Sequence, residues 1–258
     1  MLRDDPLPGP LNMARDHALA STLPPGSAVL RLYRWAVPTL SLGRNEPARG
    51  RYEPGRAREA GIDLVRRPTG GRAVLHWREL TYAAVLPLRA LGGVREAYVT
   101  LNRALRWGLA ALGVPAAIAG EVDGRRAPAP DAGPCFREPA PGEVVAGGRK
   151  LVGSAQARIG RALLQHGSIL LADDQRLIDA VRGKGRDDDP ASEAESPPAT
   201  LGDLLGRPVP WETLADAVEA GFREQLGGRW RSAPATPDPD EEARLEAKYR
   251  SPTWTWRR

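Results

Sequence analysis

The sequence is poor in residues that cross-link a chain or bind a metal. It contains one cysteine, Cys135, and three histidines, His17, His76 and His166. A single cysteine excludes a disulfide within the chain. The histidines are far apart and form no HxxxH pair, and no CxxC motif is present, so a structural zinc site is not expected. The chemistry is therefore not expected to depend on a disulfide or a zinc site.

Long apolar runs are also missing. No stretch of about 18 apolar residues could span a bilayer, and the N-terminus has no charged segment followed by an apolar one, as a signal peptide would. We therefore expect a cytoplasmic protein with no membrane partner. The 258 residues, 41% hydrophobic and 27% charged, are typical of a globular protein with one large or two small domains.

Glycine, proline and positive charge, in contrast, are plentiful. The 28 glycines and 25 prolines indicate many turns, and the formal net charge is +5. A basic protein favours acidic partners, which include both nucleic acid and acidic carrier proteins. Charge alone does not choose between them.

The hydrophobic patterns predict alternating strands and helices. Apolar residues at intervals of three and four predict helices over 12–22, 94–113 and 213–227. Alternating or β-prone runs predict strands within 28–35, 38–45, 61–87, 114–120 and 142–171, several of them joined at glycine turns. This order predicts a mixed α/β or α+β fold.

Three segments are too polar or too rich in glycine and proline for regular elements. Residues 122–134 are predicted to be a loop that delivers Cys135, and 183–199 a mobile insertion within the domain. From residue 232 we expect a Pro-rich linker, an acidic helical turn and a polar end.

The segment RRPTGGRAVLH at 66–76 places paired arginines before a Gly-Gly turn. Such a turn can present backbone N–H groups, and the guanidinium groups can bind a phosphate, a carboxylate or a thioester-bearing ligand. The same residues could form an ordinary basic β-turn on the surface. They are not a P-loop, because the GxxxxGK[ST] spacing is missing.

A second group of residues lies in GRKLVGSAQ at 148–156 and LLQHGSILL at 163–171. Lys150 could reach a bound carbonyl or a thiolate, and the small residues after it would let a ligand approach the backbone. It could equally be a solvated surface charge. Cys135, in GPCFRE, could be a nucleophile or an inert buried side chain.

Taken together and in order, these segments resemble the lipoate-protein ligase A and B family, within the biotin/lipoate protein ligase superfamily. The matching segments are NMARD at 12–16, SLGR at 41–44, RRPTGGRAVLHWRELTY at 66–82, GRKLVGSAQAR at 148–158 and LQHGSILL at 164–171. The resemblance implies a mixed, largely antiparallel sheet flanked by helices. It implies a catalytic domain over 10–230, with the insertion at about 183–199, and a polar C-terminal tail at 231–258.

Within this family, the Cys-Phe pair before the lysine and the QHGS segment after it resemble the LipM-type octanoyltransferases. The resemblance implies that Cys135 is the nucleophile and that Lys150 is the partner that lowers its pKa. Octanoyl would pass from octanoyl-acyl carrier protein to a lysine of an apo lipoyl domain or glycine-cleavage H protein, in lipoate biosynthesis. No cofactor, no metal and no nucleic acid would take part, and a monomer is expected.

The resemblance also assigns the remaining site residues. The expected substrate-binding residues are Arg67, Gly70, Gly71, Arg72, Ala73, His76, Gly153, Ser154, Ala155, His166 and Gly167. Of these, His76 and His166 are expected to shape the site by hydrogen bonding and not to act as the base.

Three other functions are compatible with the sequence. An ATP-dependent lipoate-protein ligase would use Lys150 and leave Cys135 incidental, and a lipoyl amidotransferase would differ in its donor. A non-catalytic module that binds a carrier protein or nucleic acid would form no acyl adduct.

Overall fold

Two β-sheets organise the part of the chain that the structure, a computed structural model, describes: residues 1–120, 141–183, 197–232 and 237–258. Cys135 and nearly all of the predicted 122–134 and 183–199 loops lie outside these residues. The order of strands in the large sheet is β1 (Leu2–Arg3), β2 (Val29–Tyr33), β6 (Glu79–Pro87), β10 (Ala162–Leu170), β9 (Arg149–Ile159), β8 (Val144–Ala146) and β7 (Ala116–Ile118).

The small sheet has the order β4 (Asp63–Arg66), β3 (Thr39–Leu42) and β5 (Val74–His76). Among the described strand pairs, β1 with β2 and β3 with β4 are parallel, and the others are antiparallel. The prediction of a mixed, largely antiparallel sheet flanked by helices is confirmed.

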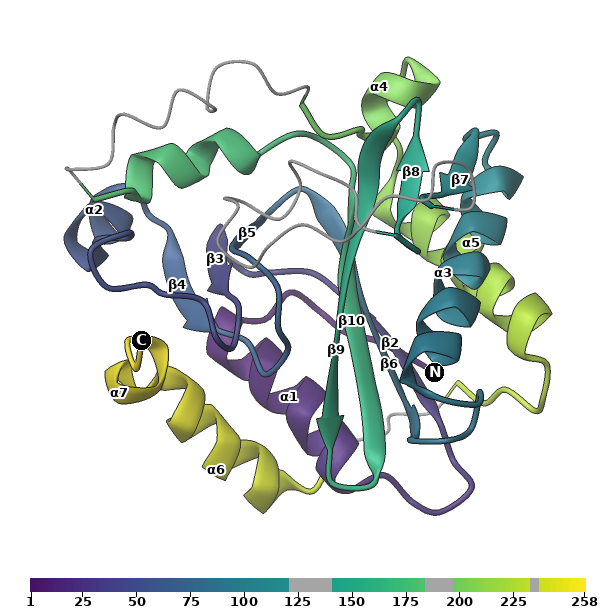
Figure 1. Ribbon diagram of the computed structural model, residues 1–258, viewed down its shortest axis with the longest axis horizontal. Helices are drawn as coiled ribbons and strands as arrows, with labels where there is room; N and C mark the ends of the chain where they lie inside the picture. The colour runs from purple at the N-terminus through teal and green to yellow at the C-terminus, as the bar shows by residue number, and fades with distance from the viewer. Residues whose placement is uncertain (121–140, 184–196, 233–236) are drawn as a thin grey trace.

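Helices cover both faces of the large sheet (Figure 1). On one side lie α1 (Gly9–Ser21) and α6 (Pro239–Arg250), which pack against each other. On the other side α3 (Val94–Ala111) packs along α5 (Trp211–Leu226). Each face encloses its own hydrophobic core.

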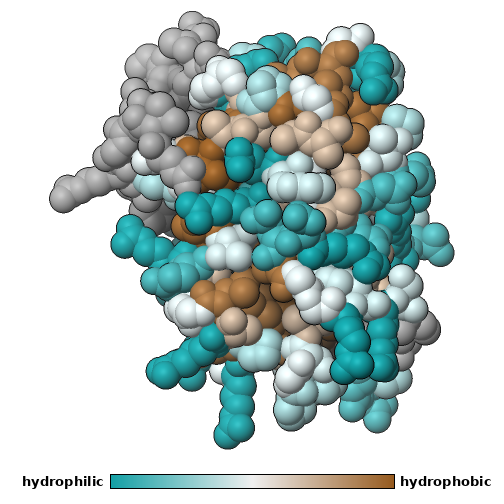
Figure 2. Space-filling model, turned by 90° about the vertical axis from the view of Figure 1, so that its right-hand side faces the viewer, coloured by the Kyte–Doolittle hydropathy of each residue, from teal (hydrophilic) through white to brown (hydrophobic). Residues whose placement is uncertain are grey.

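The outer surface on the side of α3 and α5 is mainly hydrophilic, with hydrophobic patches between the polar side chains (Figure 2). The shorter elements are α2 (Pro54–Glu59), the 3₁₀ helix η1 (Gln175–Val181), α4 (Leu201–Leu205) and α7 (Pro252–Thr255). Across the described ranges, no helix combines the length and apolarity that a membrane crossing needs.

The predicted helices and strands are present with shifts of a few residues at their ends. The hairpin series predicted at 142–171 is β8, β9 and β10, and Gly147 and Gly148 join the first two with φ of 57° and 73°. These left-handed values suit a type I′ hairpin turn.

The C-terminal segment differs from its sequence prediction of a single acidic turn. It contains the 12-residue helix α6, whose Asp238 cap accepts hydrogen bonds from the first helical amides. Its buried apolar side chains, Leu245 and Tyr249, lie four residues apart and pack on α1. So short an apolar stripe is a weak helical signal. The division into a domain at 10–230 and a tail at 231–258 stays a prediction.

Candidate functional site

The antiparallel register of β9 and β10 brings two of the sequence motifs together. Ser154 lies opposite Gly167, and Ala155 lies opposite His166. A Cβ on Gly167 would lie 2.3 Å from the Gly153 carbonyl oxygen and 2.9 Å from Tyr82. Any side chain there would clash with backbone, so glycine is required. Strands β9 and β10 and the Tyr82 ring therefore pack closely around Gly167.

The turn after β4 is held from inside by its own arginine. Arg67 Nη2 donates to the carbonyl oxygens of Arg72 at 2.7 Å and Gly70 at 2.8 Å, and Nη1 donates to Ser41 O at 2.9 Å. Arg67 and Arg72 are buried, as is Ala73, while the backbone of Gly71 is exposed with φ of 88°. These bonds make the Arg67 guanidinium group a brace for the turn.

The turn also rests on the segment after β3. A Cβ on Gly43 would lie 1.7 Å from the Gly71 carbonyl oxygen, and the Arg44 amide donates to Thr69 O at 2.8 Å. Arg66, fully buried, donates to the carbonyl oxygens of Glu46 and Thr255, both at 2.8 Å. The SLGR and RRPTGGR motifs therefore form one packed unit.

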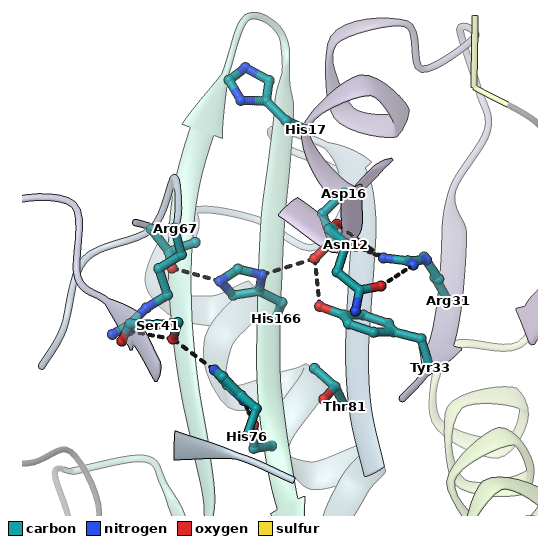
Figure 3. A network of polar contacts seen from close by, with 12 residues as sticks. Asn12, Asp16, His17, Arg31, Tyr33, Ser41, Arg67, His76, Thr81 and His166 are labelled. Atoms are coloured by element: carbon teal, nitrogen blue, oxygen red, sulfur yellow. Dashed lines mark hydrogen bonds and ion pairs between the residues drawn. The ribbon is translucent and has the colours of Figure 1, made fainter. Parts of the chain in front are cut away.

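His166 connects this turn to α1 (Figure 3). Its Nε2 is hydrogen bonded to Thr69 Oγ1 at 2.6 Å, and its Nδ1 to Asp16 Oδ2 at 3.0 Å. Asp16 also accepts from Arg31 Nη1 at 2.7 Å and from the Tyr33 hydroxyl at 2.8 Å. Helix α1, β2 and β10 thus share one buried polar network.

Charge balances burial within this network. Burial alone would raise the pKa of Asp16, but Arg31 and the bond from His166 outweigh it, and the pKa lies below its ordinary value. Burial lowers the pKa of His166 despite the attraction of Asp16. His166 is therefore a neutral hydrogen-bonding group at neutral pH.

His76 makes a second connection between the turn and the sheet. Its Nε2 is hydrogen bonded to Ser41 Oγ at 2.7 Å and its Nδ1 to Glu79 Oε1 at 2.8 Å, while its ring stacks on Trp35. Ser41 Oγ in turn accepts from Arg67 at 3.0 Å. Both histidines thus fix the position of the glycine turn.

Lys150 is buried and ion-paired. Its side chain is 2% exposed, and its Nζ lies 2.7 Å from Oε1 of Glu143, whose side chain is 5% exposed. The bulge between β8 and β9 falls at this point, where Val144 pairs with Val152 and Val145 with Lys150. A bulge of this kind redirects a side chain beside a functional site. The reading of Lys150 as a solvated surface charge is excluded by its burial.

An uncharged polar network lies beneath Ser154. The Ser154 hydroxyl is hydrogen bonded to the Tyr82 hydroxyl at 2.7 Å, Gln165 donates to Tyr82 at 2.8 Å, and Asn102 of α3 donates to Gly142 O at 2.7 Å. Burial raises the pKa of Tyr82 to about 12, so its hydroxyl stays protonated. Asn102 thereby connects this network to the residue that precedes Glu143.

Sequence reasoning missed the partners of the expected site residues. Glu143 and Glu79 carried no signal, since isolated glutamates are common on surfaces. The spacing of Asn12 and Asp16, four residues apart in NMARD, places both on one face of α1 and could have drawn attention. The described residues hold no cluster of three or more histidine, cysteine or acidic side chains suited to a metal.

The expected site residues therefore fall into three groups within the described chain. One is the patch of β9 and β10, another is the braced turn of residues 67–73 with His76, and the third is Lys150, three residues before Gly153 on β9. The arrangement offers exposed turn backbone and one buried ammonium group.

Comparisons with known proteins agree with one another. A family model described as the lipoyl protein ligase A/B catalytic domain matches residues 8–223. Octanoyltransferase LipM of Symbiobacterium thermophilum is 40% identical, over 97% of this chain and 95% of its own. Octanoyltransferase LipM of Kyrpidia tusciae is also 40% identical, over 96% of this chain and 94% of its own.

Solved structures share the fold. A putative lipoate protein ligase from T. acidophilum with bound lipoic acid has a TM-score of 0.76 at 24% identity, covering 99% of this chain and 98% of that one. A lipoate-protein ligase A bound with ATP has a TM-score of 0.78 at 23% identity, covering 99% and 97%. At such identities the likeness establishes the fold.

Proposed function

Because this chain belongs to the lipoyl protein ligase A/B catalytic domain family, we propose that it transfers octanoyl from octanoyl-acyl carrier protein to a lysine of an apo lipoyl domain or H protein. It is an octanoyltransferase of lipoate biosynthesis, as its near full-length relatives are. The reaction class, an acyl transfer to protein, requires protein partners.

The proposed nucleophile is Cys135, the single cysteine of the chain. Its thiolate attacks the thioester carbonyl of the donor, and the carrier thiolate leaves with the electron pair of the broken C–S bond. The acyl-Cys135 thioester is then attacked by the acceptor amine, which gives an amide, a proton and the free Cys135 thiolate. Thioester exchange is nearly isoenergetic and amide formation is downhill, so neither ATP nor a cofactor is needed.

The observation that carries the proposal is the buried, ion-paired ammonium group of Lys150, which lies on β9 three residues before Gly153. The Lys150 ammonium can stabilise a thiolate and the oxyanion of the tetrahedral intermediate. The proposed substrate-binding residues of β9 and β10 are Gly153, Ser154, Ala155, His166 and Gly167. The Ser154–Gly167 pair faces the α3 side of the sheet, and the Ala155–His166 pair faces the α1 side. The braced turn, with Arg67, Gly70, Gly71, Arg72, Ala73 and His76, provides backbone groups for the acyl end of the ligand.

The surface charge supports the proposed partners. Acyl carrier proteins and lipoyl domains are acidic, and this chain has a formal net charge of +5. Opposite charges raise the rate of encounter. We propose that the enzyme works as a monomer in the cytoplasm.

The proposal is tested by intact-mass spectrometry after exposure to octanoyl-acyl carrier protein without ATP. We expect the wild type to gain one octanoyl group and Cys135→Ser to gain none. Addition of an apo lipoyl domain should then move the group to the domain. A reaction with free octanoate that needs ATP would instead indicate a ligase, and consumption of an octanoylated lipoyl domain or H protein as donor would indicate an amidotransferase.

A further inference from the structure

The ion pair between Lys150 and Glu143 is built into rigid backbone. Lys150 belongs to the ladder of β9, and the Ala119 amide donates to Glu143 O at 2.8 Å from the end of β7. Asn102 of α3 holds the preceding Gly142. Both residues are thus held by backbone hydrogen bonds, with Lys150 Nζ and Glu143 Oε1 2.7 Å apart.

Burial by itself would disfavour the charge on Lys150. An ammonium group removed from water tends to lose its proton, whereas a carboxylate within hydrogen-bond distance favours the protonated form. A neutral amine could not neutralise a developing oxyanion. The carboxylate of Glu143 therefore decides in which protonation state Lys150 meets the substrate.

We infer that Glu143 is a positioning residue that keeps Lys150 protonated and directed toward the acyl site. This inference rests on the proposed function and deepens it, because it assigns the charge of Lys150 to a specific partner. Glu143 itself need not touch the substrate. Its effect on the reaction passes through the ammonium group.

Within the described residues, the neighbouring polar and ionisable side chains differ from Glu143 in charge or position. Tyr82 of β6, whose pKa is raised to about 12 by burial and in part by Glu143, stays neutral. Tyr98 of α3 donates its hydroxyl to Ser154 O. Arg149, on the opposite face of β9, donates to Pro198 O. The segment that binds the Lys150 carbonyl through the Ala199 amide, residues 197–200, carries no charge.

The experiment compares pH profiles of acyl-enzyme formation in single turnovers. Glu143→Gln keeps the shape of the side chain and removes its charge. The wild-type rate should rise with pH as the Cys135 thiol ionises. The variant rate should rise, pass a maximum and fall as Lys150 deprotonates. We expect a loss of about tenfold or more near pH 9, the scale of a lost oxyanion donor, but under about threefold near pH 6.

Two further variants make this profile specific. Glu143→Asp restores a carboxylate, so it should regain the wild-type shape in part, and it serves in place of Glu143→Gln if that variant does not fold. Asp174→Asn removes a similarly buried carboxylate that pairs with Arg78 at 2.6 Å, away from Lys150. Its profile should keep the wild-type shape.

A readout without substrate separates this inference from the proposed function. The ¹⁵N resonance of Lys150 Nζ, assigned with Lys150→Arg, should show the ammonium form persisting to higher pH in wild type than in Glu143→Gln. Identical titrations, or an equal loss of rate at every pH, would overturn the inference. A loss confined to transfer onto the acceptor would also overturn it, since Glu143 would then be the proton acceptor. A wild type that forms no adduct would refute the proposed function and leave the titration to decide on Glu143.

Discussion

The two faces of the large sheet are built on different principles. Beneath α3 and α5 the core is mainly apolar, with an uncharged hydrogen-bond network around Tyr82 and Asn102, and the helices approach so closely that a Cβ on Gly108 would lie 2.3 Å from Ala217 O. Beneath α1 lies a buried ionic network, in which Arg31 and Asp16 are both fully inaccessible to solvent. Close apolar packing with a few uncharged hydrogen bonds stabilises the first face, whereas buried ion pairs stabilise the second.

The difference between the two faces is related to the position of the braced turn of residues 67–73. Apolar packing is non-directional and tolerates exchange of similar side chains. Hydrogen bonds between buried polar groups fix distance and angle, and they are costly if any partner is lost. The network under α1 ends on Thr69, within the turn, so the directional face is also the face that positions the turn.

Substitution of Asp16 is expected to have the largest effect on stability among the changes that test this comparison. Asp16→Ala leaves the buried Arg31 without its inner carboxylate, and unpaired buried charges cost about 3–5 kcal/mol. We expect the free energy of unfolding in urea to fall by this amount. Asp16→Asn, which keeps the side-chain shape, should recover only part of it. A loss below about 1 kcal/mol would show that the network contributes little to stability.

On the apolar face, Gly108→Ala tests close packing. The added methyl group must push against the backbone of α5, at a cost of about 1–3 kcal/mol. Because the change is remote from the turn, the rate of acylation per folded molecule should stay at the wild-type value. Gly55→Ala in α2 is the matched control, since nothing lies within 4 Å of its added Cβ. Equal stability of the two variants would contradict a tight contact between α3 and α5.

The smallest effect concerns His17, where α1 meets α6. Burial, and then Lys248, lower the pKa of His17 from 6.5 to about 4 in the folded state, and its Nδ1 is hydrogen bonded to Tyr249. As pH falls, the unfolded chain takes up the proton first. The stabilisation is therefore complete above about pH 6.5 and is lost toward pH 4, by about 1–2 kcal/mol between pH 7 and 5.

Thermal unfolding across this pH window checks the prediction. The His17→Gln variant should lack this part of the pH dependence and keep the remainder. Parallel curves for wild type and variant would assign the dependence to other groups.

The fold could be predicted from local patterns. Helices such as 94–113 and the hairpins around Gly147 and Gly148 are specified by periodicity and turn residues within a few positions. The helix α6 was missed because its stripe is only Leu245 and Tyr249, and what stabilises it is α1, more than 200 residues away in sequence.

Only those residues of the candidate site that belong to a family motif could be predicted from the sequence. Lys150 and the glycine turn were found through the family resemblance, while their partners were not. His166 meets Asp16 across 150 residues and Thr69 across 97. Such pairings depend on the register of the sheet and the placement of the helix, and these cannot be inferred from the spacing of nearby residues. Glu143 lies only seven residues from Lys150, across the β8–β9 hairpin, but the residue pattern gave no sign of the β-bulge at which the two side chains meet.

The contact between Arg66 and the C-terminal segment has a consequence for folding kinetics. Arg66 donates to Thr255 O across 189 residues, and Trp254 Nε1 donates back to Arg66 O across 188. Contacts between residues so distant in sequence form slowly, because closing the long loop between them costs conformational entropy before the contact is made. The segment that packs against the braced turn therefore receives its last hydrogen bonds late, and activity should return after most of the secondary structure during refolding.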